Sequence, residues 1–266
     1  MIQVKFELSP LSKTETSEFF RLTYWSDGLR IAGFLGRPKI RGPLPAVIYN
    51  RGGRGDNSAL TGKEIVAFVD AGYVAVGSQY RGGPGSEGRD EFGGADLRDV
   101  QTLIPLLQSL PYVDGDRIAM MGVSRGGLMT HLVLKHETLA ETHQVKAAAT
   151  VGGVADLFRW MKDRPSIRDA TLVASIGKTP EEAAEAYRER SAVFWPELIN
   201  APVLLLHGEA DDRVSPEHSR EMHRLLTGLG KTAHLITYPE GGHTLGRRYE
   251  FGVPAALDWF ARWGVR

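Results

Sequence analysis

Cysteine is absent from all 266 residues, and this absence removes several chemistries at once. Disulfide bonds, thiolate metal sites and a cysteine nucleophile are excluded, and the composition fits a reducing compartment. A surplus of charge is also missing, because 32 basic side chains balance 32 acidic ones. Nothing therefore draws the chain to nucleic acid or to an anionic membrane surface.

A long apolar run is the third missing feature. No window of the sequence approaches the roughly eighteen apolar residues of a membrane span. Residues 1–10 alternate charged and apolar side chains, so they lack the continuous apolar core of a signal peptide. These absences predict a cytoplasmic protein with no membrane and no nucleic acid among its partners.

The apolar pattern predicts the fold. Residues 20–25 and 29–36 have the composition of strands, and Ser26-Asp27-Gly28 between them is typical of a hairpin turn. Beyond them, short apolar runs alternate with amphipathic segments of helix length, which indicates βαβ units with strands buried on both faces. The expected strands are 46–49, 73–77, 117–122, 147–151, 203–207 and 234–238; the expected helices are 63–71, 97–110, 125–135, 180–194, 217–229 and 250–263.

This alternation predicts one α/β domain over residues 1–266. Its central sheet is expected to be mostly parallel, entered from an N-terminal antiparallel hairpin and covered by helices on both faces. The polar residues 1–18 are expected to form a lead-in, or a short helix that contacts a partner. The segment 153–196 is longer than one crossover needs, so we expect a small cap or lid above the carboxyl ends of the strands.

The strongest chemical signal is Gly122-Val-Ser124-Arg-Gly126, which an apolar strand enters and a helical segment leaves. This is the pattern of a nucleophile elbow, where a strained turn lifts a serine above the sheet and glycines avoid clashes with the neighbouring strand and helix. The helix N-terminus also offers main-chain N–H groups to a developing oxyanion. Ser124 is therefore the predicted nucleophile; the alternative is a glycine-rich turn with an incidental serine.

A serine hydroxyl needs a base to take its proton, and His243 is the best placed of the eight histidines. It follows the last expected strand in the glycine-rich loop 239–243, which suits the chain order serine, acid, histidine. His207 ends a strand and is expected to be a buried structural residue. The helical histidines are expected to face solvent: His131, His136, His218 and His223.

The orienting acid is expected in the loop that follows His207. A carboxylate there holds the imidazole in one tautomer and stabilises the imidazolium that forms. Glu209, Asp211 and Asp212 all lie in this loop, and the residue pattern alone does not choose among them.

The oxyanion donors are expected to be main-chain amides. One comes from the turn Arg51-Gly52-Gly53 after the first parallel strand, and the other is the amide of Arg125. Residues 83–88 match a dinucleotide-binding glycine motif but open no helix, and residues 177–179 end like a P-loop whose first glycine is missing. We therefore expect no nucleotide, no other cofactor and no metal.

Taken together, residues 20–266 resemble the catalytic domain of the prolyl oligopeptidase family (peptidase S9) of the α/β-hydrolases. The resemblance is carried by Asp96-Leu-Arg-Asp99, by the elbow at Ser124, and by the segments 111–118, 201–214 and 238–243. It implies an α/β-hydrolase fold, Asp211 as the acid, and Arg213 as a residue that contacts substrate.

Two departures from the family pattern shape the functional hypothesis. The chain has no room for the β-propeller of the family's peptidases, and Arg51 stands where several members carry an oxyanion-binding tyrosine. We therefore expect a serine hydrolase that acts on small carboxylic esters, or on short peptides and amides. An exopeptidase or acylaminoacyl peptidase without a propeller is the second hypothesis, and a non-catalytic binding protein is the third. Self-association into a homo-oligomer stays open.

Overall fold

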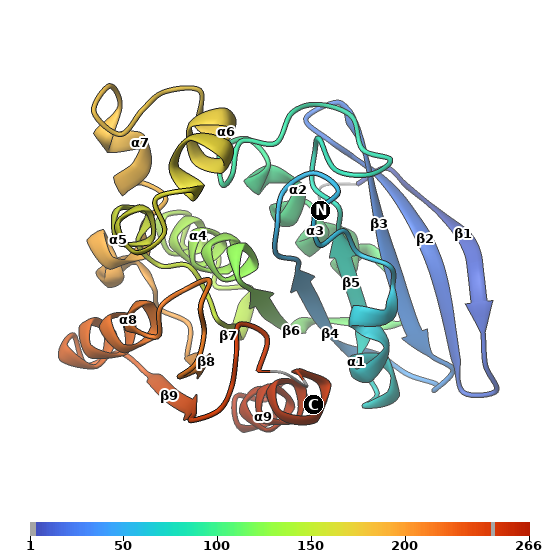
Figure 1. Cartoon of the computed structure of the whole chain (residues 1–266). Helices are drawn as coiled ribbons and strands as arrows, with labels where there is room; N and C mark the ends of the chain where they lie inside the picture. The colour runs from blue at the N-terminus through green and yellow to red at the C-terminus, as the bar shows by residue number, and fades with distance from the viewer. Residues whose placement is uncertain (1–3, 246–247) are drawn as a thin grey trace.

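The computed structural model describes residues 4–245 and 248–266. Within them nine strands form one sheet in the order β1-β2-β3-β5-β4-β6-β7-β8-β9 (Figure 1). The first three strands and the β3–β5 contact are antiparallel, whereas β4 to β9 pair in parallel. The expected mostly parallel sheet with an N-terminal antiparallel hairpin is thus confirmed. The strands are β1 (Phe6–Lys13), β2 (Ser17–Ser26), β3 (Leu29–Pro38), β4 (Leu44–Asn50), β5 (Val74–Ser78), β6 (Val113–Val123), β7 (Val145–Val151), β8 (Val203–Gly208) and β9 (Ala233–Tyr238).

Helices cover both faces of the sheet (Figure 1), and the sheet separates the apolar core into two clusters. Strands β4, β5 and β8 are buried along their whole length, which explains their continuous apolar sequences. One face packs against α1 (Val66–Asp70), which follows the 3-10 turn η1 (Lys63–Ile65), and against α9 (Arg248–Arg262). The other face packs against α2 (Leu97–Gln101), α3 (Leu103–Ser109), α4 (Arg125–Leu139) and α8 (Glu217–Gly228).

The segment 153–196 contains only short helical turns. They are α5 (Leu157–Asp163), the π-helical η2 (Arg168–Val173), α6 (Ala174–Ile176), α7 (Ala184–Arg188) and η3 (Ala192–Phe194), with η4 (Pro196–Leu198) at its end. The helix expected over 180–194 is therefore wrong. Ser191 has an extended backbone, and its hydroxyl accepts the Leu157 N–H and donates to the Tyr187 carbonyl, so tertiary contacts end α7 early.

Two further expectations need correction. Residues 6–13 form strand β1 rather than a lead-in or a helix, because Phe6 and Leu8 turn one face of the chain toward the core margin while the other face stays polar. The helix expected over 97–110 divides into α2 and α3 at Thr102, whose hydroxyl donates to the Arg98 carbonyl.

Candidate active site

Ser124 stands on a sharp turn between β6 and α4. Its backbone has φ 58° and ψ −121°, a left-handed conformation that strains a residue with a side chain. Three main-chain bonds hold this turn: the Ser124 N–H donates to the Val151 carbonyl at 2.9 Å, and the Ser124 carbonyl accepts the N–H groups of Gly127 at 2.9 Å and of Val154 at 3.2 Å. The strand therefore delivers the hydroxyl to the carboxyl end of the sheet, as the elbow pattern predicts.

The two glycines of the elbow are required by close approach. A Cβ atom on Gly126 would lie 1.9 Å from the Asn50 carbonyl oxygen at the end of β4. A Cβ atom on Gly122 would lie 2.1 Å from the carbonyl oxygen of Gly126 in the helix. No side chain fits at either position without moving the turn. This close approach explains why glycine stands two residues before and two residues after Ser124.

Asp211 and His243 meet beside this turn. The imidazole Nδ1 lies 2.8 Å from Oδ2 and 3.0 Å from Oδ1 of the carboxylate. The Asp211 side chain is fully buried, and its Oδ1 also accepts the N–H groups of Arg213 and Val214. Burial opposes ionisation, but the contacts from His207 and His243 outweigh it and hold the pKa of the Asp211 carboxyl well below its ordinary value.

The geometry also distinguishes Asp211 from its neighbours in the loop. Asp212 is exposed, and Glu209 binds the Arg220 side chain on α8. Within the part of the chain that the structure describes, neither carboxylate contacts the imidazole of His243, whereas Asp211 does.

His207 supports the acid rather than competing with it. Its Nε2 lies 2.8 Å from the Val214 carbonyl, which can only accept, so Nε2 carries the proton. Its Nδ1 then accepts from the Ser219 hydroxyl at 2.7 Å, and the same Nε2 approaches Asp211 Oδ2 at 3.2 Å. The residue is fully buried, as expected for a structural histidine that anchors the acid loop.

The turn after β4 passes directly beside Ser124. A Cβ atom on Gly52 would lie 3.2 Å from Ser124 Cβ and 3.8 Å from its Oγ. Among the described residues, none accepts a hydrogen bond from the Gly52 N–H. The Arg51 guanidinium turns away and donates to the carbonyls of Gly55, Asn57 and Gln79, so it fastens the turn without replacing a tyrosine hydroxyl.

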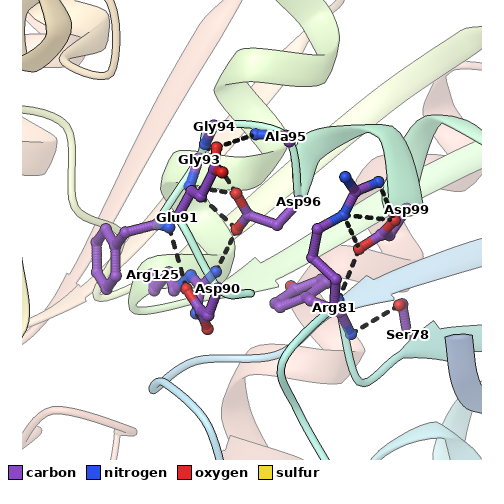
Figure 2. A network of polar contacts seen from close by, with 12 residues as sticks. Ser78, Arg81, Asp90, Glu91, Gly93, Gly94, Ala95, Asp96, Asp99 and Arg125 are labelled. Carbon is purple, nitrogen blue, oxygen red and sulfur yellow. Dashed lines mark hydrogen bonds and ion pairs between the residues drawn. The ribbon is translucent and has the colours of Figure 1, made fainter. Parts of the chain in front are cut away.

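A second buried arginine holds the same turn from the helix side. The Arg125 side chain donates to the Gly53 carbonyl at 2.8 Å. It also donates to Asp90 at 2.6 Å and contacts Asp96, as Figure 2 shows. The guanidinium and both carboxylates are buried. The sequence pattern gave Arg125 only its main-chain amide, so this role of its side chain was missed, together with both carboxylate partners.

A pocket of about 470 Å³ opens above these residues. Ser124 and His243 line it, together with Trp160 and Ile167 from the segment 153–196. Arg213 also lines it, where the resemblance placed a substrate contact. Among the described residues, no group of acidic or histidine side chains is arranged to hold a metal ion, and no helix is long and apolar enough to cross a bilayer.

Comparison with known proteins supplies the family. Residues 59–264 match the model of the prolyl oligopeptidase family. The chain belongs to this family. Its likeness to the uncharacterized peptidase YtmA of Bacillus subtilis agrees, with 33% identity over 232 residues that cover 87% of this chain and 88% of the relative. The membership confirms the sequence-based expectation of a serine hydrolase.

Solved structures of low identity bear out the α/β-hydrolase fold. A puromycin-hydrolyzing peptidase from Mycobacterium tuberculosis superposes with a TM-score of 0.79 at 24% identity, over 93% of this chain and 40% of that one. Acetyl xylan esterase 1 from Thermoanaerobacterium sp. JW/SL YS485 gives 0.74 at 18% identity, over 99% and 89% of the two chains. The chain also spans only about a third of another Bacillus subtilis relative, the uncharacterized peptidase YuxL, at 34% of its length.

The expectation that the helical histidines face solvent is wrong for two of them in this member of the prolyl oligopeptidase family. His131 on α4 and His218 on α8 are both buried. The ring of His218 accepts the N–H groups of Ala155 and Asp156 through Nδ1, which ties α8 to the start of the segment 153–196. Periodicity alone did not show this burial, because α4 is covered on nearly all sides.

Proposed function

We propose that Ser124, His243 and Asp211 form a catalytic triad that hydrolyses small carboxylic esters through an acyl-enzyme. The observation that carries the proposal is the short Asp211–His243 contact beside the strained Ser124 turn, with both Ser124 and His243 lining one pocket. His243 Nε2 takes the proton from Ser124 Oγ as the oxygen attacks the ester carbonyl carbon. Asp211 keeps the other proton on Nδ1 and stabilises the imidazolium.

The negative oxygen of the tetrahedral intermediate needs preorganised donors. We assign this role to the main-chain amide of Arg125, in the first turn of α4, and to the amides of the turn Arg51-Gly52-Gly53. Support comes from the position of Gly52 against Ser124, and from the two arginine side chains that fix the turn. His243, as imidazolium, then protonates the leaving alcohol. In the second half of the reaction His243 takes a proton from water as the water oxygen attacks the acyl carbon, and it returns this proton to Ser124 Oγ as the acyl–oxygen bond to the serine breaks.

Peptide hydrolysis is the second candidate. The relative at 33% identity is named a peptidase, which favours this activity. The turn at Arg51 favours esters, because this arginine stands where several peptidases of the family carry an oxyanion-binding tyrosine. On either reading, the segment 153–196 acts as a cap that shapes the acyl or leaving-group side of the pocket.

The test compares single and double substitutions on short 4-nitrophenyl esters and aminoacyl 4-nitroanilides. Ser124→Ala and His243→Ala are each expected to lower kcat by about 10⁴ to 10⁶, and the double variant by no more than either alone, because the two groups act as one unit. Ser124→Ala activity within about tenfold of the wild type would remove Ser124 from the mechanism. Faster cleavage of anilides than of esters would favour the peptidase.

A further inference from the structure

The pocket above Ser124 departs from the charge balance of the chain. The whole sequence holds 32 basic and 32 acidic residues. The charged side chains that line the pocket are instead five arginines and one glutamate, counted within the described residues: Arg51, Arg54, Arg125, Arg164, Arg213 and Glu64. The excess of positive charge is therefore local to the proposed site.

Three of these six side chains already form ion pairs or hydrogen bonds with other parts of the protein. Arg125 is neutralised by Asp90 and Asp96 behind the pocket, and Arg51 is bound to main-chain carbonyls. The Glu64 carboxylate accepts the N–H groups of residues 61 and 62 at 3.0 and 3.1 Å. It is held by its own turn and does not reach an arginine of the pocket.

The other three arginines have no carboxylate partner among the described residues. Arg164 and Arg213 are exposed, and Arg54 is half-buried, with one long contact of 3.5 Å to the Ala170 carbonyl. They come from three separate parts of the chain: the turn after β4, the end of α5, and the acid loop. Three unpaired guanidinium groups thus converge on one cavity.

Hydrogen bonds fix the backbones that carry two of these side chains. The Trp160 indole N–H donates to the Arg213 carbonyl at 2.7 Å, and the Arg164 N–H donates to the Trp160 carbonyl at 2.9 Å. The Arg213 N–H donates to Asp211 Oδ1 at 2.9 Å. The backbone of Arg213 is therefore bound to the proposed acid and to the Trp160 indole, and the backbone of Arg164 is bound to the main chain of Trp160.

We propose that this pocket selects esters or amides that carry a carboxylate or another anionic group near the scissile carbonyl, recognised by Arg54, Arg164 and Arg213. The inference rests on the proposed function. Guanidinium groups bind carboxylates through two parallel N–H donors. Trp160 and Ile167 line the same pocket as these arginines and add apolar surface to it.

Two matched substrate pairs test the proposal. In the first pair the charge lies on the acyl side: mono-4-nitrophenyl glutarate against 4-nitrophenyl valerate. In the second it lies on the leaving side: 4-acetoxybenzoate against methyl 4-acetoxybenzoate. After normalisation to the hydroxide-catalysed rates, the anionic member of at least one pair is expected to have a kcat/KM about tenfold higher. High salt is expected to reduce this ratio by screening.

Substitutions test whether Arg54 and Arg164 cause the preference for anionic substrates. Arg164→Gln and Arg54→Gln are each expected to lower the anionic-to-neutral ratio by roughly threefold to tenfold, mainly through KM, and Arg164→Glu is expected to lower it further. Arg168→Gln is the matched control, because Arg168 lies on the same segment but outside the pocket and pairs with Asp169 and Glu181. Its ratio is expected to stay at the wild-type value.

The outcomes separate this inference from the proposed function. Cleavage of the neutral esters with no anionic preference in either pair would overturn the inference and leave the serine hydrolase intact. A preference that survives Arg164→Glu and Arg54→Gln would overturn it as well. If no ester of either pair is cleaved and a fluorophosphonate fails to label Ser124, the proposed function itself is wrong.

Discussion

Replacing Asp211 by asparagine tests which carboxylate orients the base. An asparagine carbonyl can keep the two bonds that Asp211 Oδ1 accepts from the N–H groups of Arg213 and Val214. Its NH₂ group then faces His243 Nδ1, where Oδ2 now lies at 2.8 Å. Because this NH₂ donates, Nδ1 must accept, and the ring proton moves to Nε2, the atom that has to take the serine proton.

The expected loss follows from this wrong tautomer. Asp211→Asn should lower kcat by about 10³ to 10⁴, which corresponds to roughly 4–5.5 kcal/mol of activation free energy. The same NH₂ group would also face the Nε2–H of His207, which lies 3.2 Å from Oδ2. Two donors in contact should cost about 1–2 kcal/mol of unfolding free energy, so the variant should fold with a lowered Tm.

Asp212→Asn is the matched control, since it makes the same isosteric change one residue along on an exposed side chain. Its kcat should stay within about threefold of the wild type, as for surface substitutions away from a site. Both variants are assayed on a short 4-nitrophenyl ester near neutral pH, with Tm measured alongside. If Asp212→Asn lowered kcat by orders of magnitude, or if Asp211→Asn kept a kcat within about tenfold of the wild type, Asp211 would not be the carboxylate that orients His243.

Two further predictions concern buried charged and polar groups. Arg125→Met leaves Asp90 and Asp96 buried without a counter-charge and releases the Gly53 carbonyl, so it should cost about 3–5 kcal/mol in urea denaturation and also lower kcat. Arg81→Met is the control, because it breaks a comparably buried pair with Asp99 that does not contact the turn at Gly53 (Figure 2). It should lower the free energy of unfolding by a similar amount and leave the kcat of the folded fraction unchanged. Equal kcat losses in the two variants would show that the Arg125 contact with Gly53 does not support catalysis. Burial lowers the pKa of His131 to about 4, and neither ring nitrogen has a partner among the described residues. Because the unfolded chain takes up the proton that the folded state refuses, the free energy of unfolding should fall by about 3 kcal/mol between roughly pH 6.5 and 4. His131→Leu should flatten this slope, and an unchanged slope would show that His131 does not cause it.

Local and periodic features of the fold were readable from the sequence. The parallel strands appeared as continuous apolar runs because both of their faces are covered, and the elbow appeared because close approach leaves room only for glycine at positions 122 and 126. Strand β1 was missed because its alternation of half-buried apolar side chains is limited to Phe6 and Leu8, while residues 9–13, with Leu11 among them, are exposed.

Contacts between residues far apart in the chain could not be predicted from the sequence. The partners of Arg125 lie 35 and 29 residues before it in the chain, and no spacing rule joins them. The burial of His131 and His218 likewise depends on how other segments pack around α4 and α8. Asp211 could be preferred to Asp212 only through the family resemblance, until its contact with His243 was seen.

The proposed function requires that Ser124 is a nucleophile activated by His243. The most direct measurement is the intact mass of the protein after exposure to a fluorophosphonate, followed by peptide mapping. We expect one adduct per chain, located on Ser124, formed rapidly in the wild type and far more slowly in His243→Ala. An adduct on another residue, or equal labelling rates in the wild type and His243→Ala, would contradict it.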